Sequence, residues 1–233
     1  MRTLAIIIVL LMTVLKGHAE EFSPYFCASA HVGDVYRFKS VNTKLEFNYE
    51  RPFLGGGSQF EAGITSESNS YYIAYYHFSS DDYSTFESGF GWHHNWERFE
   101  WHTNTAWTWK EELIAIGGRL HLNSGRHFKV QPIIGIGIML CQSRLTSDRQ
   151  YAYYDTSGNA VYTSHWRTSH WSDVYPGLCT EFGFLIHVAK SVDVNMLSQL
   201  HCFWTELPGD VGTKNEYFVV AQSLQLGILY SFK

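Results

Sequence analysis

The chain has 233 residues, a formal net charge of −5 and an aromatic content of 17%. The acidic balance argues against nucleic acid as a partner, because phosphate binding needs a basic surface. Four cysteines are too few for a disulfide scaffold at this length. Many aromatic residues and glycines, without helical runs, favour one sizeable all-β domain.

The N-terminal segment 1–19 has the pattern of a cleaved export signal. Arg2 gives a positive start, residues 4–15 form an apolar core, and Gly17-His18-Ala19 offers small residues to a signal peptidase. The apolar core is short for a spanning helix, which needs about 20 residues. Segment 20–40 is expected to be an N-terminal extension or part of the first strand.

The remaining domain, residues 41–233, shows apolar and polar side chains that alternate with a period of two. This alternation predicts strands, because successive side chains of a strand point to opposite faces. The alternating segments are 43–50, 59–65, 70–78, 83–92, 98–109, 112–122, 130–141, 178–188, 192–204 and 223–232. They predict about ten strands, and eight if short early segments merge.

The connections between these strands differ in length. Asn123-Ser124-Gly125 and Lys190-Ser191 have the composition of tight turns. The polar stretch 143–172 is predicted to be a long outer loop, and 207–215 another. Short turns at one end and long loops at the other are typical of a membrane barrel.

The two faces of the predicted strands carry different side chains. One is bulky and apolar, while the other mixes glycine with ionisable groups and has few lysines. A soluble β-sandwich or lipocalin-like barrel would turn its apolar face inward, and alternation alone does not exclude this. The scarcity of lysine favours a membrane barrel with an ionisable, narrow lumen.

The final strand reads Leu224-x-Leu226-x-Ile228-x-Tyr230-x-Phe232, followed by Lys233. This pattern resembles the signal by which barrel-assembly machinery recognises its clients. Together with the export signal and the repeated strands, it makes the chain resemble the small bacterial outer-membrane β-barrels, a porin-like and adhesin-like family with eight to ten strands. The resemblance implies an antiparallel up-and-down transmembrane β-barrel in the bacterial outer membrane, with outer-membrane lipids and the assembly machinery as partners.

The ionisable groups of the polar face are interpreted as a structural ion network. A narrow barrel fills its interior with side chains, and buried charges must then be paired. A metal or acid–base site is the alternative reading, but no catalytic residue, metal or cofactor is expected. The predicted network contains Glu46, Glu87, Arg98, Glu100, His102, Arg119, His121, Glu181, Asp193 and His201. Glu61 lies on the same face.

The predicted outer loop contains a tandem repeat. Thr163-Ser164-His165-Trp166 is followed by Thr168-Ser169-His170-Trp171, with tyrosines upstream. Exposed Tyr and Trp stack on sugars or on a protein partner; the alternative is an aromatic rim at the membrane interface. The candidate binding residues are Tyr153, Tyr154, His165, Trp166, His170 and Trp171.

The sequence thus predicts a non-enzymatic outer-membrane barrel with a structural role or a role in surface binding and adhesion, its ligand a surface glycan or protein. A small pore or transporter is the alternative. A lipid A-modifying enzyme is a third, since His170-Trp171-Ser172 has the spacing of the deacylase motif, but Asp173 replaces the asparagine that follows there. A Cys141–Cys179 disulfide across the outer loop stays open.

Overall fold

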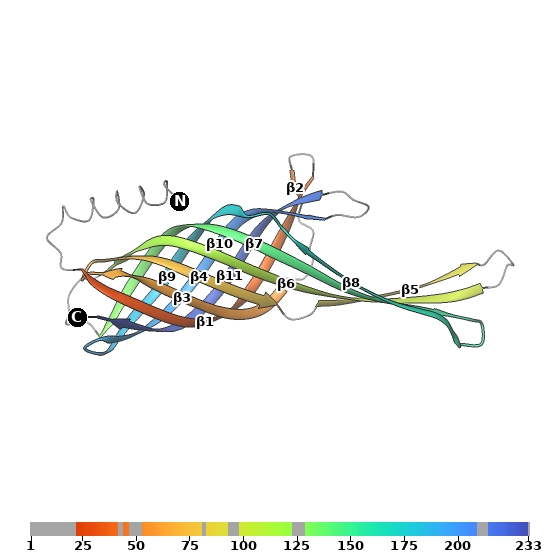
Figure 1. Ribbon diagram of the computed structural model, residues 1–233, viewed down its shortest axis with the longest axis horizontal. Helices are drawn as coiled ribbons and strands as arrows, with labels where there is room; N and C mark the ends of the chain where they lie inside the picture. The colour runs from red at the N-terminus through yellow and green to blue at the C-terminus, as the bar shows by residue number, and fades with distance from the viewer. Residues whose placement is uncertain are drawn as a thin grey trace.

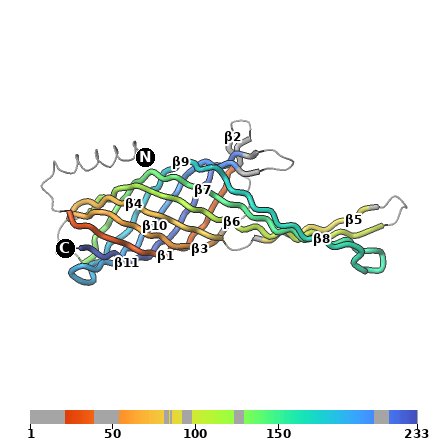
Figure 2. Tube along the Cα trace, in the orientation of Figure 1, coloured from red at the N-terminus to blue at the C-terminus, as the bar shows by residue number. Residues whose placement is uncertain are grey.

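The structure, a computed structural model, describes residues 22–41, 44–46, 53–80, 83–92, 98–122, 129–208 and 214–232. These residues form antiparallel strands (Figures 1 and 2). The strands are β1 (Ser23–Val41), β2 (Lys44–Glu46), β3 (Phe53–Thr65), β4 (Asn69–Ser80), β5 (Tyr83–Trp92), β6 (Arg98–His121), β7 (Val130–Tyr154), β8 (Ala160–Trp171), β9 (Tyr175–Ala189), β10 (Val192–Pro208) and β11 (Lys214–Ser231). No helix among the described residues is long and apolar enough to cross a membrane.

Eight strands pair into a ring. β1 pairs with β3 on one side and with β11 on the other. The pairing continues from β3 through β4, β6, β7, β9 and β10 to β11, antiparallel at every step. A ring has no free edge, so the backbone donors and acceptors of its strands bond to one another. The predicted antiparallel barrel is confirmed, with two further long strands, β5 and β8, outside the ring.

The first strand of the ring is β1. Segment 20–40, expected to be either an N-terminal extension or part of the first strand, therefore contributes a barrel strand. Small residues hide its alternation, because Ala28 and Ala30 occupy outward positions that carry large apolar groups elsewhere. The predicted strand 43–50 lies mostly outside the described residues, apart from β2, which pairs with β1. The predicted export signal 1–19 also lies outside them.

Strands β6 and β7 are about twice as long as a membrane-spanning strand needs, at 24 and 25 residues. Segments 98–109 and 112–122, predicted as two strands, are both parts of β6. The apolar alternation is interrupted at Lys110-Glu111-Glu112, yet the backbone pairing with β7 continues through these residues. The interruption therefore marks a change of surroundings rather than the end of a strand.

The distal halves of these strands form a four-stranded sheet, which projects beyond the ring along the long axis of the molecule (Figure 1). We call it the extension: β5, residues 98–109 of β6, residues 145–154 of β7, and β8. The predicted outer loop 143–172 is therefore mostly strand. Its Tyr, Trp and Thr residues favour strands, but both faces are polar enough to hide the alternation.

The opposite end of the barrel carries the described chain ends and short connections. The turn Lys190-Ser191 joins β9 to β10 there, as predicted. In the connection between β3 and β4, the Ser66 hydroxyl accepts hydrogen bonds from the backbone N–H groups of Ser68 and Asn69 at 3.3 and 3.1 Å. The predicted turn Asn123-Ser124-Gly125 lies outside the described residues.

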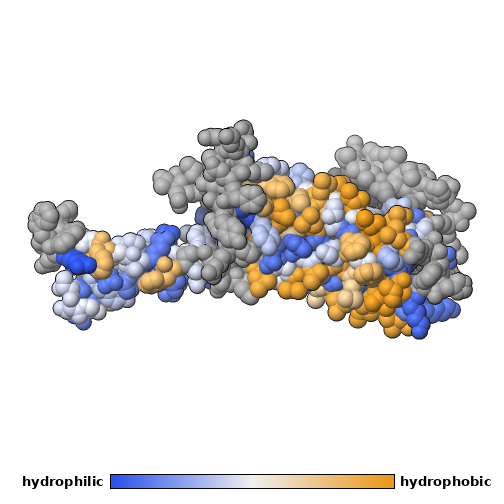
Figure 3. All heavy atoms as spheres, turned by 180° about the vertical axis from the view of Figure 1, so that it is seen from behind, coloured by the Kyte–Doolittle hydropathy of each residue, from blue (hydrophilic) through white to orange (hydrophobic). Residues whose placement is uncertain are grey.

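The barrel is apolar outside and polar inside. On β7, Ile134, Ile136 and Ile138 point outward and are 49–64% exposed. On the side drawn in Figure 3, apolar side chains gather over much of the barrel, and mostly polar ones cover the extension. A soluble barrel would bury such residues, so the soluble alternative is wrong, and the predicted assignment of the two faces is confirmed for the strands of the ring. In segment 98–109 the assignment was reversed, because its odd-numbered residues continue the inner face of the barrel.

Candidate functional site

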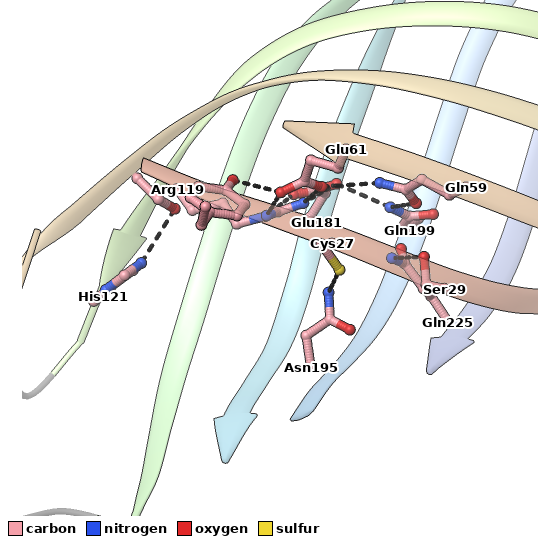
Figure 4. A network of polar contacts seen from close by, with 12 residues as sticks. Cys27, Ser29, Gln59, Glu61, Arg119, His121, Glu181, Asn195, Gln199 and Gln225 are labelled. Carbon is pink, nitrogen blue, oxygen red and sulfur yellow. Dashed lines mark hydrogen bonds and ion pairs between the residues drawn. The ribbon is translucent and has the colours of Figure 1, made fainter. Parts of the chain in front are cut away.

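A buried ion cluster fills the middle of the barrel (Figure 4). Arg119 of β6 projects inward between Glu61 of β3 and Glu181 of β9. Its Nη2 donates to Glu61 Oε2 at 2.7 Å, and its Nε donates to Glu181 Oε2 at 2.6 Å. All three side chains are 3% exposed or less. Because one guanidinium faces two carboxylates, other donors must satisfy the remaining carboxylate oxygens.

Amide and phenol donors from the same and other strands supply these bonds. Gln59 Nε2 donates to Glu61 at 3.0 Å, and Gln199 Nε2 donates to Glu181 at 2.9 Å. The hydroxyls of Tyr25 and Tyr76 donate to Glu61 and Glu181, respectively. These residues come from β1, β3, β4 and β10, and with Arg119 of β6 and Glu181 of β9 the hydrogen-bonded network spans the lumen at this height.

The registers of three strands bring the cluster together at a glycine. Gly135 of β7 lies opposite Arg119 on one side and Glu181 on the other. A Cβ at Gly135 would lie 2.9 Å from Glu181 Oε2 and 3.0 Å from Arg119 Cγ. The glycine therefore leaves the space that lets the guanidinium reach its carboxylate.

The structure divides the predicted ion network. Arg119, His121, Glu181 and His201 are buried inside the barrel. Asp193 pairs with His187 beside the turn between β9 and β10, at 2.6 Å. Four members lie on the extension instead: Glu87, Arg98, Glu100 and His102. The side chain of Glu46 lies outside the described residues.

Sequence reasoning omitted Glu61, Gln59 and Gln199 from the network. All three occupy inward positions. The signal in the sequence was that an arginine inside the lumen needs a carboxylate partner. This signal could not identify Glu61, because the carboxylate that meets Arg119 depends on the register between strands that are distant in the sequence. Among the described residues, no group of three or more His, Cys, Asp or Glu side chains could hold a metal ion.

The four cysteines are free thiols. Cys141 lies opposite Tyr175, whereas Cys179 lies opposite Gly137, so the two cysteines of the suggested disulfide sit four positions apart along the paired strands. A disulfide needs Cα atoms within about 7 Å. The suggested Cys141–Cys179 bridge is therefore wrong.

The extension has one aromatic face. This face continues the inner face of the barrel, because β6 and β7 pair without a register shift and their side chains keep alternating between the same two sides. Phe99 and Tyr153 have ring centroids 5.4 Å apart, and Tyr153 and Tyr162 follow at 5.7 Å. A second row joins Tyr151 to Trp166 at 5.7 Å. We call this the aromatic face: Phe99, Trp101, Tyr151, Tyr153, Tyr162 and Trp166.

Glycines of the edge strand β5 receive two of these rings. A Cβ at Gly89 would lie 2.7 Å from the Trp101 ring, and one at Gly91 would lie 2.3 Å from the Phe99 ring. Both rings thus lie across the neighbouring backbone, which holds them flat against the sheet. The aromatic face is therefore a broad platform rather than a set of free side chains.

The other face of the extension is mostly polar. His165 Nε2 lies 2.5 Å from Asp148 Oδ1, and His102 Nε2 lies 2.8 Å from Glu100 Oε1. A hollow of about 330 Å³ lies on this face. It is lined by Asn104, Ala106, Thr108, Thr146, Asp148, Gln150 and Arg167.

The six predicted binding residues divide between the two faces. Tyr153, Trp166 and His170 lie on the aromatic face, as their cross-strand partners show. Tyr154, His165 and Trp171 lie on the polar face. Because the repeat has a period of five residues, an odd number, corresponding residues of its two copies lie on opposite faces of the strand.

An ordered turn closes the hairpin between β7 and β8. The Asp155 carboxylate accepts backbone N–H bonds from Ser157 and Asn159, and Gly158 takes a positive φ of 81°. These bonds, chiefly that from Asn159, hold the pKa of Asp155 below its usual value. The charged carboxylate thus stabilises the turn and fixes the tip of this hairpin.

The serine of the deacylase-like spacing has a structural role. The Ser172 hydroxyl accepts the backbone N–H of Ser143 at 2.9 Å and donates to the carbonyl of Asp173 at 2.7 Å. The side chain is 5% exposed, where β8 returns to the barrel. Both bonds tie the hydroxyl to the backbone.

No protein-family model and no curated protein sequence matches the chain. Its fold is similar to Neisserial surface protein A (NspA), with a TM-score of 0.51 and 15% identity over 91% of this chain and 100% of that one. The attachment invasion locus protein Ail of Yersinia pestis matches with a TM-score of 0.40 and 11% identity over 91% and 99%. OprG of Pseudomonas aeruginosa gives 0.44 and 12% over 90% and 96%. The likeness to NspA is one of fold.

Proposed function

We propose that this chain, a small bacterial outer-membrane β-barrel by its fold, is a non-enzymatic surface-binding protein whose aromatic face holds an external glycan. The barrel lies in a bacterial outer membrane, since it combines this fold with an apolar outer belt. The observation that carries the proposal is the aromatic face, where rings from three strands form one surface.

The orientation follows from the two ends of the barrel. Barrels of this class keep their termini and short turns in the periplasm and their long connections outside. The extension then projects away from the cell, and the described chain ends face the periplasm. The outward residues Leu224, Leu226, Ile228, Tyr230 and Phe232 of the final strand would meet outer-membrane lipids and the barrel-assembly machinery.

The filled lumen favours binding over transport. The network around Arg119 crosses the barrel interior, and its members are hydrogen-bonded to one another. A solute would have to break buried ion pairs to pass, which costs several kcal/mol. The small-pore alternative has no comparable support.

A glycan is favoured over a protein because flat rings and polar groups share this face. Tyrosine and tryptophan offer an apolar body with a polar tip, suited to sugar rings that are apolar on one side and hydroxylated at the rim. Arg149 reaches across the same face, where its Nε donates to Thr105 at 3.3 Å and its guanidinium lies 5.7 Å from the Tyr151 ring.

Binding to arrayed bacterial and host glycans by the full chain in detergent micelles tests the proposal. We expect Y153A/W166A to lower the affinity for a bound glycan at least about tenfold, as for central aromatic anchors. The matched control is Y154A/W171A, which removes the same two residue types from the polar face and should bind like the unchanged protein.

Equal loss in both variants would contradict a role for the aromatic face. Absence of binding to every glycan, with binding to whole cells that protease treatment abolishes, would make the ligand a protein.

A further inference from the structure

We infer that the outer edge of β8 pairs antiparallel with β8 of a second copy of this chain, held in an opposing membrane. This contact uses the backbone edge of the extension and goes beyond ligand binding by the aromatic face.

The edge of β8 is long and open. β8 pairs with β7 on one side, and no strand among the described residues pairs with its other side. Its 12 residues are exposed along almost their whole length and include no Lys, Pro or Gly. Proteins usually protect edge strands by shortening them, or with Lys, Pro or bulges. β8 has one irregularity of register, at Val161 beside the tip, and pairs regularly with β7 from Tyr162 to Trp171. An unprotected edge is a template for another strand.

The order of residues in β8 is symmetric by chemical class around Trp166. Basic side chains flank Trp166 at 165 and 167, hydroxyls follow at 163, 164, 168 and 169, aromatic rings at 162 and 170, and large apolar groups at 161 and 171. A two-fold contact requires such a surface, because each residue meets the symmetry-related position of its own strand.

Antiparallel pairing centred on Trp166 brings aromatic residues opposite aromatic residues and hydroxyls opposite hydroxyls. Trp166 faces Trp166 of the second copy, Tyr162 faces His170, and Ser164 faces Thr168. Aromatic pairs and hydroxyl pairs stabilise neighbouring strands. His165 meets Arg167 of the second copy, and Asp148 bonds to His165 and lies opposite Arg167 on its own sheet.

The direction of β8 decides where the second copy lies. β8 runs along the extension, which continues the long axis of the barrel (Figure 2). Antiparallel pairing reverses the second extension, so the two barrels lie at opposite ends of the joined sheet. One membrane cannot hold both barrels in this arrangement, and the contact therefore links two membranes.

Clustering of vesicles tests the inference without any ligand. The full chain is reconstituted into vesicles of phosphatidylethanolamine and phosphatidylglycerol, and clustering is followed by light scattering. The unchanged protein should cluster its vesicles. In S164K/T168K and in S164E/T168E, each charge faces a like charge of the second copy, so each variant alone should cluster at least about tenfold less. Mixing the two kinds of vesicle should restore clustering, because opposite charges then meet.

The matched controls place the same charges on β5, the other edge of the extension. Ser84 and Ser88 are also exposed and four residues apart, and S84K/S88K or S84E/S88E vesicles should cluster like the unchanged protein. The inference is overturned if unchanged vesicles stay dispersed, if the β8 variants cluster alone, or if folded β8 variants fail to cluster when mixed.

A cross-link provides a second measurement without added charges. Residues 166 of the two copies face each other, so W166C should form a disulfide-linked dimer between vesicles under mild oxidation. The control S88C should not. Absence of the W166C dimer in clustered vesicles would refute the proposed register.

Discussion

Arg119 supplies the positive charge that pairs with the two buried carboxylates of the barrel interior. Its guanidinium bonds two carboxylates and lies 4.2 Å from the ring of Tyr72. A buried cluster of paired charges such as this contributes little net stability, because the cost of desolvating the charges offsets their attraction. Removal of Arg119 is costly, because two buried carboxylates then lose their cation.

We expect Arg119→Met to lower the free energy of unfolding by about 3–5 kcal/mol, the usual cost of breaking a buried ion pair. Urea unfolding of the protein in lipid vesicles measures this change. Arg98→Met is the control, because Arg98 is exposed on the extension and lies over Phe90 at 3.8 Å, so its loss should cost about 1 kcal/mol or less. A small effect of Arg119→Met would show that the interior rearranges or admits water.

Strands β6 and β7 act as single elements in two surroundings. Their proximal halves pair with β4 and β9 within the ring, while their distal halves pair with β5 and β8. The two sets of pairings use different residues. The extension is therefore an outgrowth of the ring and is not needed to close it.

Deleting residues 84–106 and 147–169 together should leave the barrel folded. The pairings of β6 with β4 and of β7 with β9 lie outside both deletions. Heat-modifiable migration in gel electrophoresis and the urea midpoint of the barrel should match those of the full chain. Loss of the folded band would mean that the extension is required for barrel assembly.

At the scale of the whole molecule, the two parts differ in what their exposed apolar residues meet. Ile136 of the barrel and Val161 of the extension are similarly exposed, at 63% and 67%. Ile136 belongs to the continuous belt around the ring, whereas Val161 lies near the tip of the extension. Equal exposure should therefore correspond to lipid in one case and to water in the other.

Ile136→Arg should lower the free energy of unfolding in vesicles by about 2–4 kcal/mol, as for a charge on the lipid face near the middle of a bilayer. Val161→Arg should change it by less than about 0.5 kcal/mol, as for an ordinary surface substitution. Similar values for the two variants would contradict the position of the belt in the membrane.

The sequence by itself determined the fold class and the two faces of the ring strands, because strand alternation is local and every barrel strand must separate lipid from lumen. It assigned the faces of segment 98–109 the wrong way round, because this segment lies on the extension, where the contrast between lipid and lumen is lost. It also placed Arg119, His121, Glu181 and His201 on the inner face. Only the tertiary structure decided which groups meet, since the bonds of Arg119 to Glu61 and Glu181 depend on registers between distant strands. The extension could not be predicted for a related reason. Outside the lipid, both faces of segment 143–172 are polar enough to resemble a loop, and only its pairing with neighbouring strands makes it part of a sheet.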